Sequence, residues 1–159
     1  LVHDWLPAAY ADGANLAARA HMLVAASMGA TAFQKGLGAV HSISHPAGAM
    51  YGVHHGLANA VVLPYVLKFN RPAIEDRMMR LAQVLGLPDP GFDAVMGWIV
   101  ELRKILGIPH SFAEAGVPET DADALAEAAA KDPTAPGNPV PVDAAALKGI
   151  LLDCVRGEL

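Results

Sequence analysis

The most informative segment of the chain is residues 36–59, Gly36-Leu-Gly-Ala-Val-His41-Ser-Ile-Ser-His45-Pro-Ala-Gly-Ala-Met-Tyr-Gly-Val-His54-His55-Gly56-Leu-Ala-Asn59. Four of the chain's seven histidines stand between positions 41 and 55, among small and apolar neighbours. His41 and His45 are four residues apart, so on a helix their rings lie on one face. His55 follows at a point where a second helix can begin. Imidazoles on neighbouring helices are typical ligands of divalent transition metals.

Two interpretations of these histidines stay open at this point. A single histidine on an apolar face is usually a hydrogen-bonded core residue. However, the segment from Gly36 to Leu67 contains no charged residue, and burying several imidazoles there costs free energy unless each ring finds a partner. A bound cation provides partners for two or three rings at once. The spacing therefore favours a metal site, with purely structural histidines as the alternative.

Composition predicts an all-α fold and excludes several classes of function. Hydrophobic residues make up 53% of the chain and aromatic residues only 6%, a mixture rich in alanine and aliphatic side chains that favours helices over sheets. The net charge of -5 and the scattered basic residues argue against nucleic-acid binding. The longest apolar run, Leu57 to Leu67, is too short to span a bilayer. A single cysteine suits a reducing compartment, and we expect a cytoplasmic protein.

Helical periodicity recurs along the chain. Asn15 is expected to cap a helix that Gly29 closes, with an apolar face made by Leu16, Ala20, Leu23 and Val24. Pro46, just after His45, is expected to kink or break its helix. A helix is expected to run from His55 toward Asn70 with a disturbance at Pro64, and a separate helix to follow Pro72. Further stripes are predicted at Phe92, Val95, Trp98, Ile99, Leu102 and Leu106, and at Leu147, Ile150, Leu151 and Cys154.

Caps and turns complete this secondary-structure prediction. Asp143 is expected to cap the last helix, and Thr120 with Asp123 to form a capping box before Leu125. The segment 86–91 is expected to form a turn, because it is rich in glycine and proline. Cys154 is interpreted as a small core residue and not as a nucleophile.

The residues from Gly36 to Asn70 closely resemble the metal-binding signature of the iron-containing alcohol dehydrogenases, which are NAD(P)-dependent enzymes. The resemblance implies that His41 and His55 coordinate a divalent metal, with iron as the usual ion and zinc as an alternative. It also implies that His45 lies beside the nicotinamide and the substrate, as a catalytic residue. His54 has no such role, because its ring points elsewhere than that of its neighbour. One departure is Ala47, where the family usually has a larger aliphatic residue.

The resemblance also implies two further metal ligands and a nucleotide-binding region that residues 1–159 do not contain. The family's metal takes two further ligands from an Asp-x-x-x-His pair, and this sequence contains no such pair. The family's nucleotide-binding α/β half is not found here either. Residues 1–159 are therefore expected to be the carboxyl-terminal part of an all-helical metal-binding and catalytic domain, in an enzyme of roughly 350 to 400 residues.

Two more residues become candidates through the resemblance. The loop from Asp132 to Pro141 resembles a family loop that folds toward the active site, in which Thr134 falls at a substrate-lining position. Its hydroxyl offers both a donor and an acceptor to a polar substrate. Phe33 corresponds to an aromatic residue that faces the substrate, although the spacing to Gly36 is one residue shorter, so core packing is an equal alternative.

The implied activity is interconversion of an alcohol with an aldehyde or ketone by hydride transfer, with NAD or NADP as cofactor. The expected partners are a small alcohol or aldehyde, the nicotinamide cofactor and a second copy of the chain in a homo-oligomer, with no nucleic acid and no membrane. The isolated chain is expected to be inactive. Two alternatives remain: a non-catalytic helical interaction module with structural histidines, and a helical metal-dependent hydrolase that uses His41, His45 and His55 as ligands. Against the hydrolase, no carboxylate lies between His41 and His55.

Overall fold

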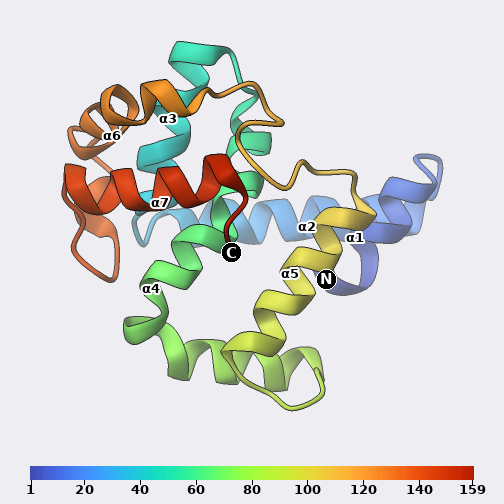
Figure 1. Cartoon of the computed structure of the whole chain (residues 1–159). Helices are drawn as coiled ribbons and strands as arrows, with labels where there is room; N and C mark the ends of the chain where they lie inside the picture. The colour runs from blue at the N-terminus through green and yellow to red at the C-terminus, as the bar shows by residue number, and fades with distance from the viewer. The chain divides into compact units, whose positions relative to one another are not determined.

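The computed structural model describes all residues 1–159 and is helical throughout, as the composition predicted. The elements in chain order are α1 (Val2–Ala11), α2 (Leu16–Phe33), α3 (Ala39–Tyr51), α4 (His55–Leu85), α5 (Phe92–Ile105), the short 3-10 helix η1 (Glu119–Asp121), α6 (Ala122–Ala130), the 3-10 turn η2 (Ala135–Gly137) and α7 (Ala144–Arg156) (Figure 1). No helix combines the length and the apolar character needed to cross a membrane.

The chain divides into two compact units, Leu1–Gly36 and Leu37–Leu159. The first is a hairpin of α1 and α2, in which the Trp5 ring stacks on His21 at 4.2 Å between centroids. Asn15 caps α2 by accepting a hydrogen bond from the Ala18 amide, as predicted. The helix continues through Gly29 to Phe33, so the predicted end at Gly29 is wrong. The predicted apolar face is also largely exposed, with Leu16 at 75% and Leu23 at 73%.

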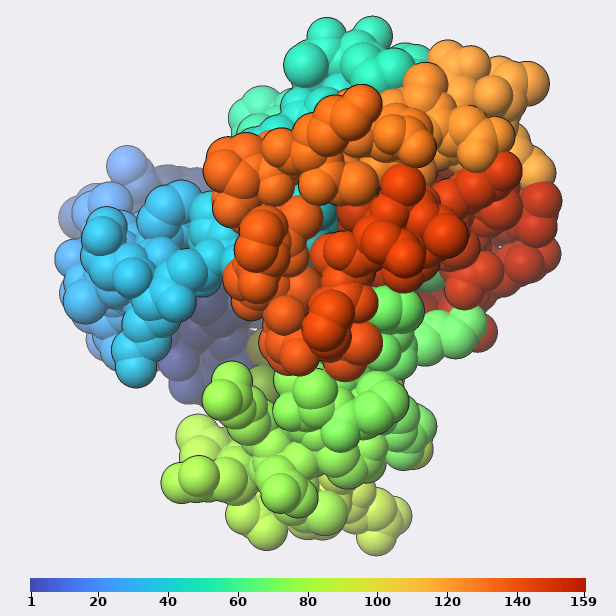
Figure 2. Space-filling model, turned by 90° about the vertical axis from the view of Figure 1, so that its left-hand side faces the viewer, coloured from blue at the N-terminus to red at the C-terminus, as the bar shows by residue number.

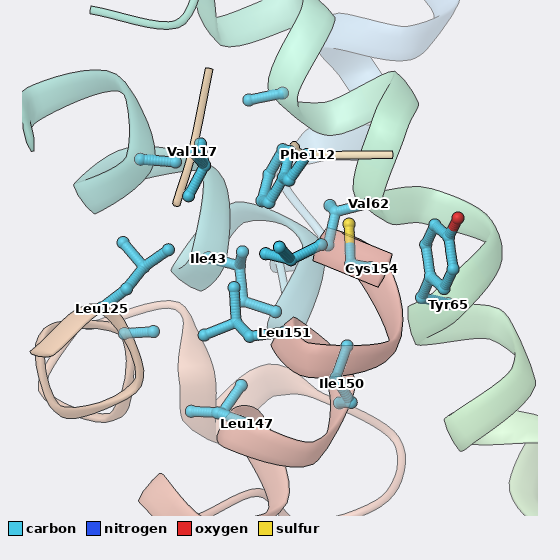
Figure 3. Packing of buried hydrophobic residues seen from close by; sticks show 14 of the residues in the cluster. Ile43, Val62, Tyr65, Phe112, Val117, Leu125, Leu147, Ile150, Leu151 and Cys154 are labelled. Atoms are coloured by element: carbon cyan, nitrogen blue, oxygen red, sulfur yellow. The ribbon is translucent and has the colours of Figure 1, made fainter. Parts of the chain in front are cut away.

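The second unit contains a main core formed by α3, the first half of α4, α6 and α7. Figure 3 shows Ile43, Leu125, Leu147 and Leu151 meeting in this core, with Cys154 beside Tyr65 and Val62. Asp143 caps α7 through the Ala146 amide, as predicted. The apolar stripe of α7 is buried along its length, and Cys154 is fully buried. These results confirm the prediction of a core stripe on the last helix.

A smaller cluster joins the second half of α4 to α5 and contains Ile74, Met78, Ala82, Phe92 and Val95. In Figure 2 the yellow-green residues that follow the middle of α4 project away from the orange and red atoms of α6 and α7. The turn predicted at 86–91 separates the two helices, with Gly86 in the left-handed region at φ 65.

All three prolines lie inside helices, so the separate helix expected after Pro72 is wrong. Pro46 is within α3, while Pro64 and Pro72 are both within α4, which runs unbroken for 31 residues. A proline inside a helix removes one hydrogen bond and costs about 3 kcal/mol. Here the apolar residues on either side are buried, as is Pro64 itself, and their burial offsets that cost. Figure 1 shows α4 bending in its middle, which is the usual effect of an internal proline.

The capping box predicted before α6 is not formed. The Thr120 hydroxyl donates to the Asp121 carboxylate and not to a free amide of the helix. The three preceding residues form η1 instead, and α6 begins with no side-chain cap. The local sequence pattern is therefore overridden by a short 3-10 turn.

A buried amide pair joins the loop 132–141 to α3 and α4. The Asn138 side chain accepts hydrogen bonds from the Ala39 amide at 3.1 Å and from Asn70 Nδ2 at 3.0 Å. Its own Nδ2 donates to Asn70 Oδ1 and to the Val140 carbonyl, both at 2.7 Å. All four hydrogen-bonding positions of the amide are thus used. The pair fixes the first residue of α3, and with it the register of the histidines that follow.

Glycine is needed where this loop meets the start of α3. A Cβ atom at Gly137 would overlap the carbonyl oxygen of Leu37, and one at Gly38 would lie 2.9 Å from Asn138 Oδ1. Both contacts are closer than a side chain allows. The glycines therefore let the two backbones approach closely enough for the amide pair to form.

Replacing Asn138 by alanine is expected to destabilise the second unit. The change leaves the Ala39 amide and the Asn70 side chain buried without partners, at about 1–3 kcal/mol for each unsatisfied group. Urea unfolding should show the free energy of unfolding falling by about 2–4 kcal/mol. Gln83→Ala, an exposed amide on α4, is the matched control and should change it by less than about 0.5 kcal/mol. Equal effects of the two variants would contradict the role given to the amide pair.

Burial of Cys154 predicts a loss of stability at alkaline pH. Burial raises the pKa of the Cys154 thiol to about 12, whereas an exposed thiol titrates near about 8.5. Below about pH 8.5 the thiol is protonated in both states, so its contribution is fully present. As the pH rises toward about 12, the unfolded state loses the proton first and the free energy of unfolding falls. Urea melts against pH should show this fall, and Cys154→Ala should make it shallower; an unchanged slope would contradict the assignment.

Candidate metal centre

Three histidine rings predicted to share a site lie together. His41 and His45 stand one turn apart on α3, and His55 is the first residue of α4. The ring centroids are 5.8 Å apart for His41 and His45, 5.4 Å for His41 and His55, and 5.3 Å for His45 and His55. The short turn containing Gly52, whose φ is 68, reverses the chain between the two helices. It thereby returns His55 to the face of α3 that carries the other two rings.

The ring nitrogens of His41 and His55 converge on one atom. Nδ2 of Asn59 lies 3.4 Å from His41 Nε2 and 3.1 Å from His55 Nε2. An amide nitrogen only donates, so both Nε2 atoms act as acceptors and their lone pairs face the same point. Asn59 Oδ1 is buried beside them with no hydrogen-bond partner. Two imidazole lone pairs aimed at a common point form a donor set that fits a divalent transition metal.

Ser44 supports the same tautomer at His55. The Ser44 hydroxyl donates to the His41 carbonyl at 3.3 Å and lies 3.4 Å from His55 Nδ1. Because the hydroxyl proton is used by the carbonyl, His55 Nδ1 is the donor in the second contact. Histidines that bind metals usually have such a partner on the other ring nitrogen, which orients the ring.

The surroundings of His41 favour its neutral form. Burial lowers the pKa of His41, and the neighbouring His55 and His45 lower it further, while Asp132 opposes them. A neutral imidazole is the form that can coordinate a metal. The surroundings of His41 therefore favour the protonation state that a ligand requires.

His45 has a different partner. Its Nδ1 lies 2.8 Å from Asp132 Oδ2, and its side chain is 40% exposed. Sequence reasoning missed Asp132, which follows α6 and stands 87 residues from His45. The only sequence signal was its place at the head of the loop that contains Thr134. His45 therefore has a different hydrogen-bond partner from His41 and His55, whose rings both contact Asn59.

Thr134 lies at this side of the site, but its polar groups are already used. Its amide and its hydroxyl both donate to Asp132 Oδ1, at 2.9 Å and 2.6 Å. Any polar contact of Thr134 with a substrate is therefore limited to the acceptor side of its hydroxyl. Phe33 is the last residue of α2, in the first unit, and its side chain is 51% exposed.

His41, His45 and His55 are not arranged as the three-histidine metal site that the hydrolase alternative requires. No group of three or more His, Cys, Asp or Glu side chains in the chain is arranged to hold one metal ion. The physical reason is that His45 is turned to Asp132, while only His41 and His55 share Asn59. His54 is exposed at the cap position of α4, next to the ring that does take part.

Comparison with known proteins identifies the family. Residues 1–155 match the profile described as the Fe-containing alcohol dehydrogenase family, C-terminal. The chain is 40% identical over 146 residues to the NAD-dependent methanol dehydrogenase of Bacillus methanolicus, covering 87% of this chain and 38% of that protein. It is 40% identical over 149 residues to the 4-hydroxybutyrate dehydrogenase of Cupriavidus necator, covering 88% and 38% respectively.

A solved structure has the same fold. The crystal structure of a 1,3-propanediol oxidoreductase superposes with a TM-score of 0.92 at 32% identity, covering 96% of this chain and 42% of that one. The chain thus spans about two-fifths of the length of these relatives. The all-helical architecture, the histidine signature and these matches lead to one assignment: the chain belongs to the iron-containing alcohol dehydrogenase family, of which it represents the C-terminal helical region.

Proposed function

We propose that residues 1–159 are the carboxyl-terminal part of the metal-binding and catalytic domain of an NAD(P)-dependent alcohol dehydrogenase. In this proposal His41 and His55 are two ligands of a divalent metal, iron in the first place and zinc as the alternative. The observation that carries the proposal is the convergence of their Nε2 atoms on Asn59. The name of the methanol dehydrogenase relative supports NAD as the cofactor.

The chemistry divides between the bound groups and the chain's own residues. When bound, the metal supplies positive charge that polarises the substrate oxygen, and the nicotinamide exchanges a hydride with the substrate carbon. His41 and His55 bind the cation as neutral imidazoles. His45, with Nδ1 bonded to Asp132, presents Nε2 as a proton acceptor for the alcohol. Thr134 is proposed to line the substrate pocket, which accepts a small alcohol or aldehyde. Phe33, in the first unit, is a separate candidate for a substrate-facing residue.

Single-histidine variants of the complete enzyme test this division of roles. His41→Ala and His55→Ala should each lose the metal and the activity, because each removes a ligand. His45→Ala should keep the metal and lower turnover by about 10²–10⁴-fold, the usual contribution of a general base. Metal content by elemental analysis and the nicotinamide absorbance assay measure the two effects.

His54, the exposed neighbour of His55, provides the matched control for these variants. His54→Ala removes an imidazole next to His55 and should keep both metal and turnover. Loss of metal from His45→Ala would show that His45 is a ligand, and retention of stoichiometric metal by His41→Ala would remove His41 from the ligand set.

The 159-residue chain alone is expected to bind metal weakly and to show no dehydrogenase activity. It contributes two histidine ligands and contains no Asp-x-x-x-His pair, and two ligands hold a divalent ion less tightly than four. Titration with Zn²⁺ and an assay with ethanol and both nicotinamide cofactors measure these properties. Tight stoichiometric zinc or measurable turnover would contradict the expectation.

A further inference from the structure

The carboxylate of Asp132 is held in one orientation. Oδ1 accepts two hydrogen bonds from Thr134, from the amide at 2.9 Å and from the hydroxyl at 2.6 Å. Oδ2 is left for His45 Nδ1, at 2.8 Å. The Asp132 side chain is only 12% exposed, so water has little access to compete for these bonds. The two bonds from Thr134 therefore fix the orientation of the Asp132 carboxylate, so that Oδ2 faces His45.

Asp132 is ionised in this arrangement. Burial raises the pKa of Asp132, but the bonds from the Thr134 hydroxyl and amide and from His45 together lower it below its ordinary value. An ionised carboxylate only accepts hydrogen bonds. The proton in the contact with His45 must therefore sit on the Nδ1 atom of the imidazole.

This proton placement decides what the other nitrogen of His45 can do. A neutral imidazole protonated at Nδ1 has a lone pair at Nε2 and accepts a proton there. The ring of His45 stacks on that of His55, at 18° between planes and 5.3 Å between centroids. The acceptor is therefore held beside one of the two residues proposed as metal ligands.

We propose that Asp132 is a positioning residue, which fixes His45 in the Nδ1-protonated tautomer so that its Nε2 takes the hydroxyl proton of the alcohol. The inference rests on the proposed function and extends it. In the oxidation direction, the substrate O–H bond breaks and the proton goes to Nε2. The C–H bond breaks with its electron pair as hydride goes to the oxidised nicotinamide, and C–O becomes C=O.

The geometry also provides for the charge that this step creates. His45 becomes an imidazolium, whose positive charge lies against the Asp132 carboxylate at 2.8 Å. Because the His45 side chain is 40% exposed, the proton can leave to water after the step. Asp132 thus orients the base before the transfer and stays hydrogen-bonded to it afterwards.

Nitrogen-15 NMR of the histidine rings in the metal-free 159-residue chain tests the tautomer directly, at about pH 8.5 where ordinary imidazoles are neutral. The unaltered chain should show His45 protonated at Nδ1. Asp132→Asn should switch it to Nε2, because the side-chain amide of asparagine donates to Nδ1. Asp123→Asn, at an aspartate 76% exposed and paired with Lys148, is the matched control and should leave the tautomer unchanged.

A second variant covers the case in which Asp132→Asn does not fold. Thr134→Val keeps the shape of the side chain and removes one of the two bonds to Oδ1, so it should yield a mixture of His45 tautomers. An Nε2-protonated ring in the unaltered chain would overturn the inference. The inference would also be overturned if both variants fold and neither changes the tautomer of His45. If only Thr134→Val folds, an unchanged tautomer in that variant would overturn it.

Turnover in the complete enzyme separates this inference from the proposed function. Asp132→Asn should keep the metal, lower kcat by at least about 10-fold and change KM little; its effect should not add to that of His45→Ala, since both act through one group. If His45→Ala keeps full turnover, the proposed role of His45 fails. If His45→Ala is impaired and Asp132→Asn is not, the inference about Asp132 fails alone.

Discussion

The amide pair between Asn138 and Asn70 is the interaction on which the arrangement of the second unit depends. It joins three segments that are distant in the sequence: the start of α3, the middle of α4 and the loop that follows α6. α3 carries two of the histidines, α4 carries the third, and the loop carries Asp132. Every polar atom of the Asn138 side chain is paired in this arrangement, so a shift of any one of the three segments would leave a buried amide group without a partner.

The parts of the fold that are determined locally could be predicted from the sequence. Asn15 and Asp143 cap their helices because a short polar side chain reaches an amide three residues later, whatever the rest of the chain does. The helix boundary expected at Pro72 was wrong for the opposite reason. Whether a proline ends a helix depends on how much apolar surface the residues beyond it bury, and that burial is determined by packing between distant segments. Pro64 is itself buried inside α4.

The candidate site shows the same division. The grouping of His41, His45 and His55 follows from spacing on two successive helices, and the structure brings the rings together. Their different hydrogen-bond partners do not follow from spacing. Asn59 lies within the quoted motif, one turn after His55 on α4, yet its contact with the His41 ring depends on the angle between α3 and α4. Asp132 reaches His45 only because α6 packs on α3, a contact that no local pattern encodes.

The hairpin of α1 and α2 differs from the second unit in the source of its stability. Among the residues of these two helices only Ala18 is buried, and large apolar side chains such as Leu16 and Leu23 stay exposed. The hairpin therefore relies mainly on the Asn15 cap of α2 and on the high helix propensity of alanine, which alone support marginal structure. Amide hydrogen exchange is therefore expected to show the hairpin opening at a lower free energy than the second unit, with the amides around Asn138 and Cys154 among the most protected.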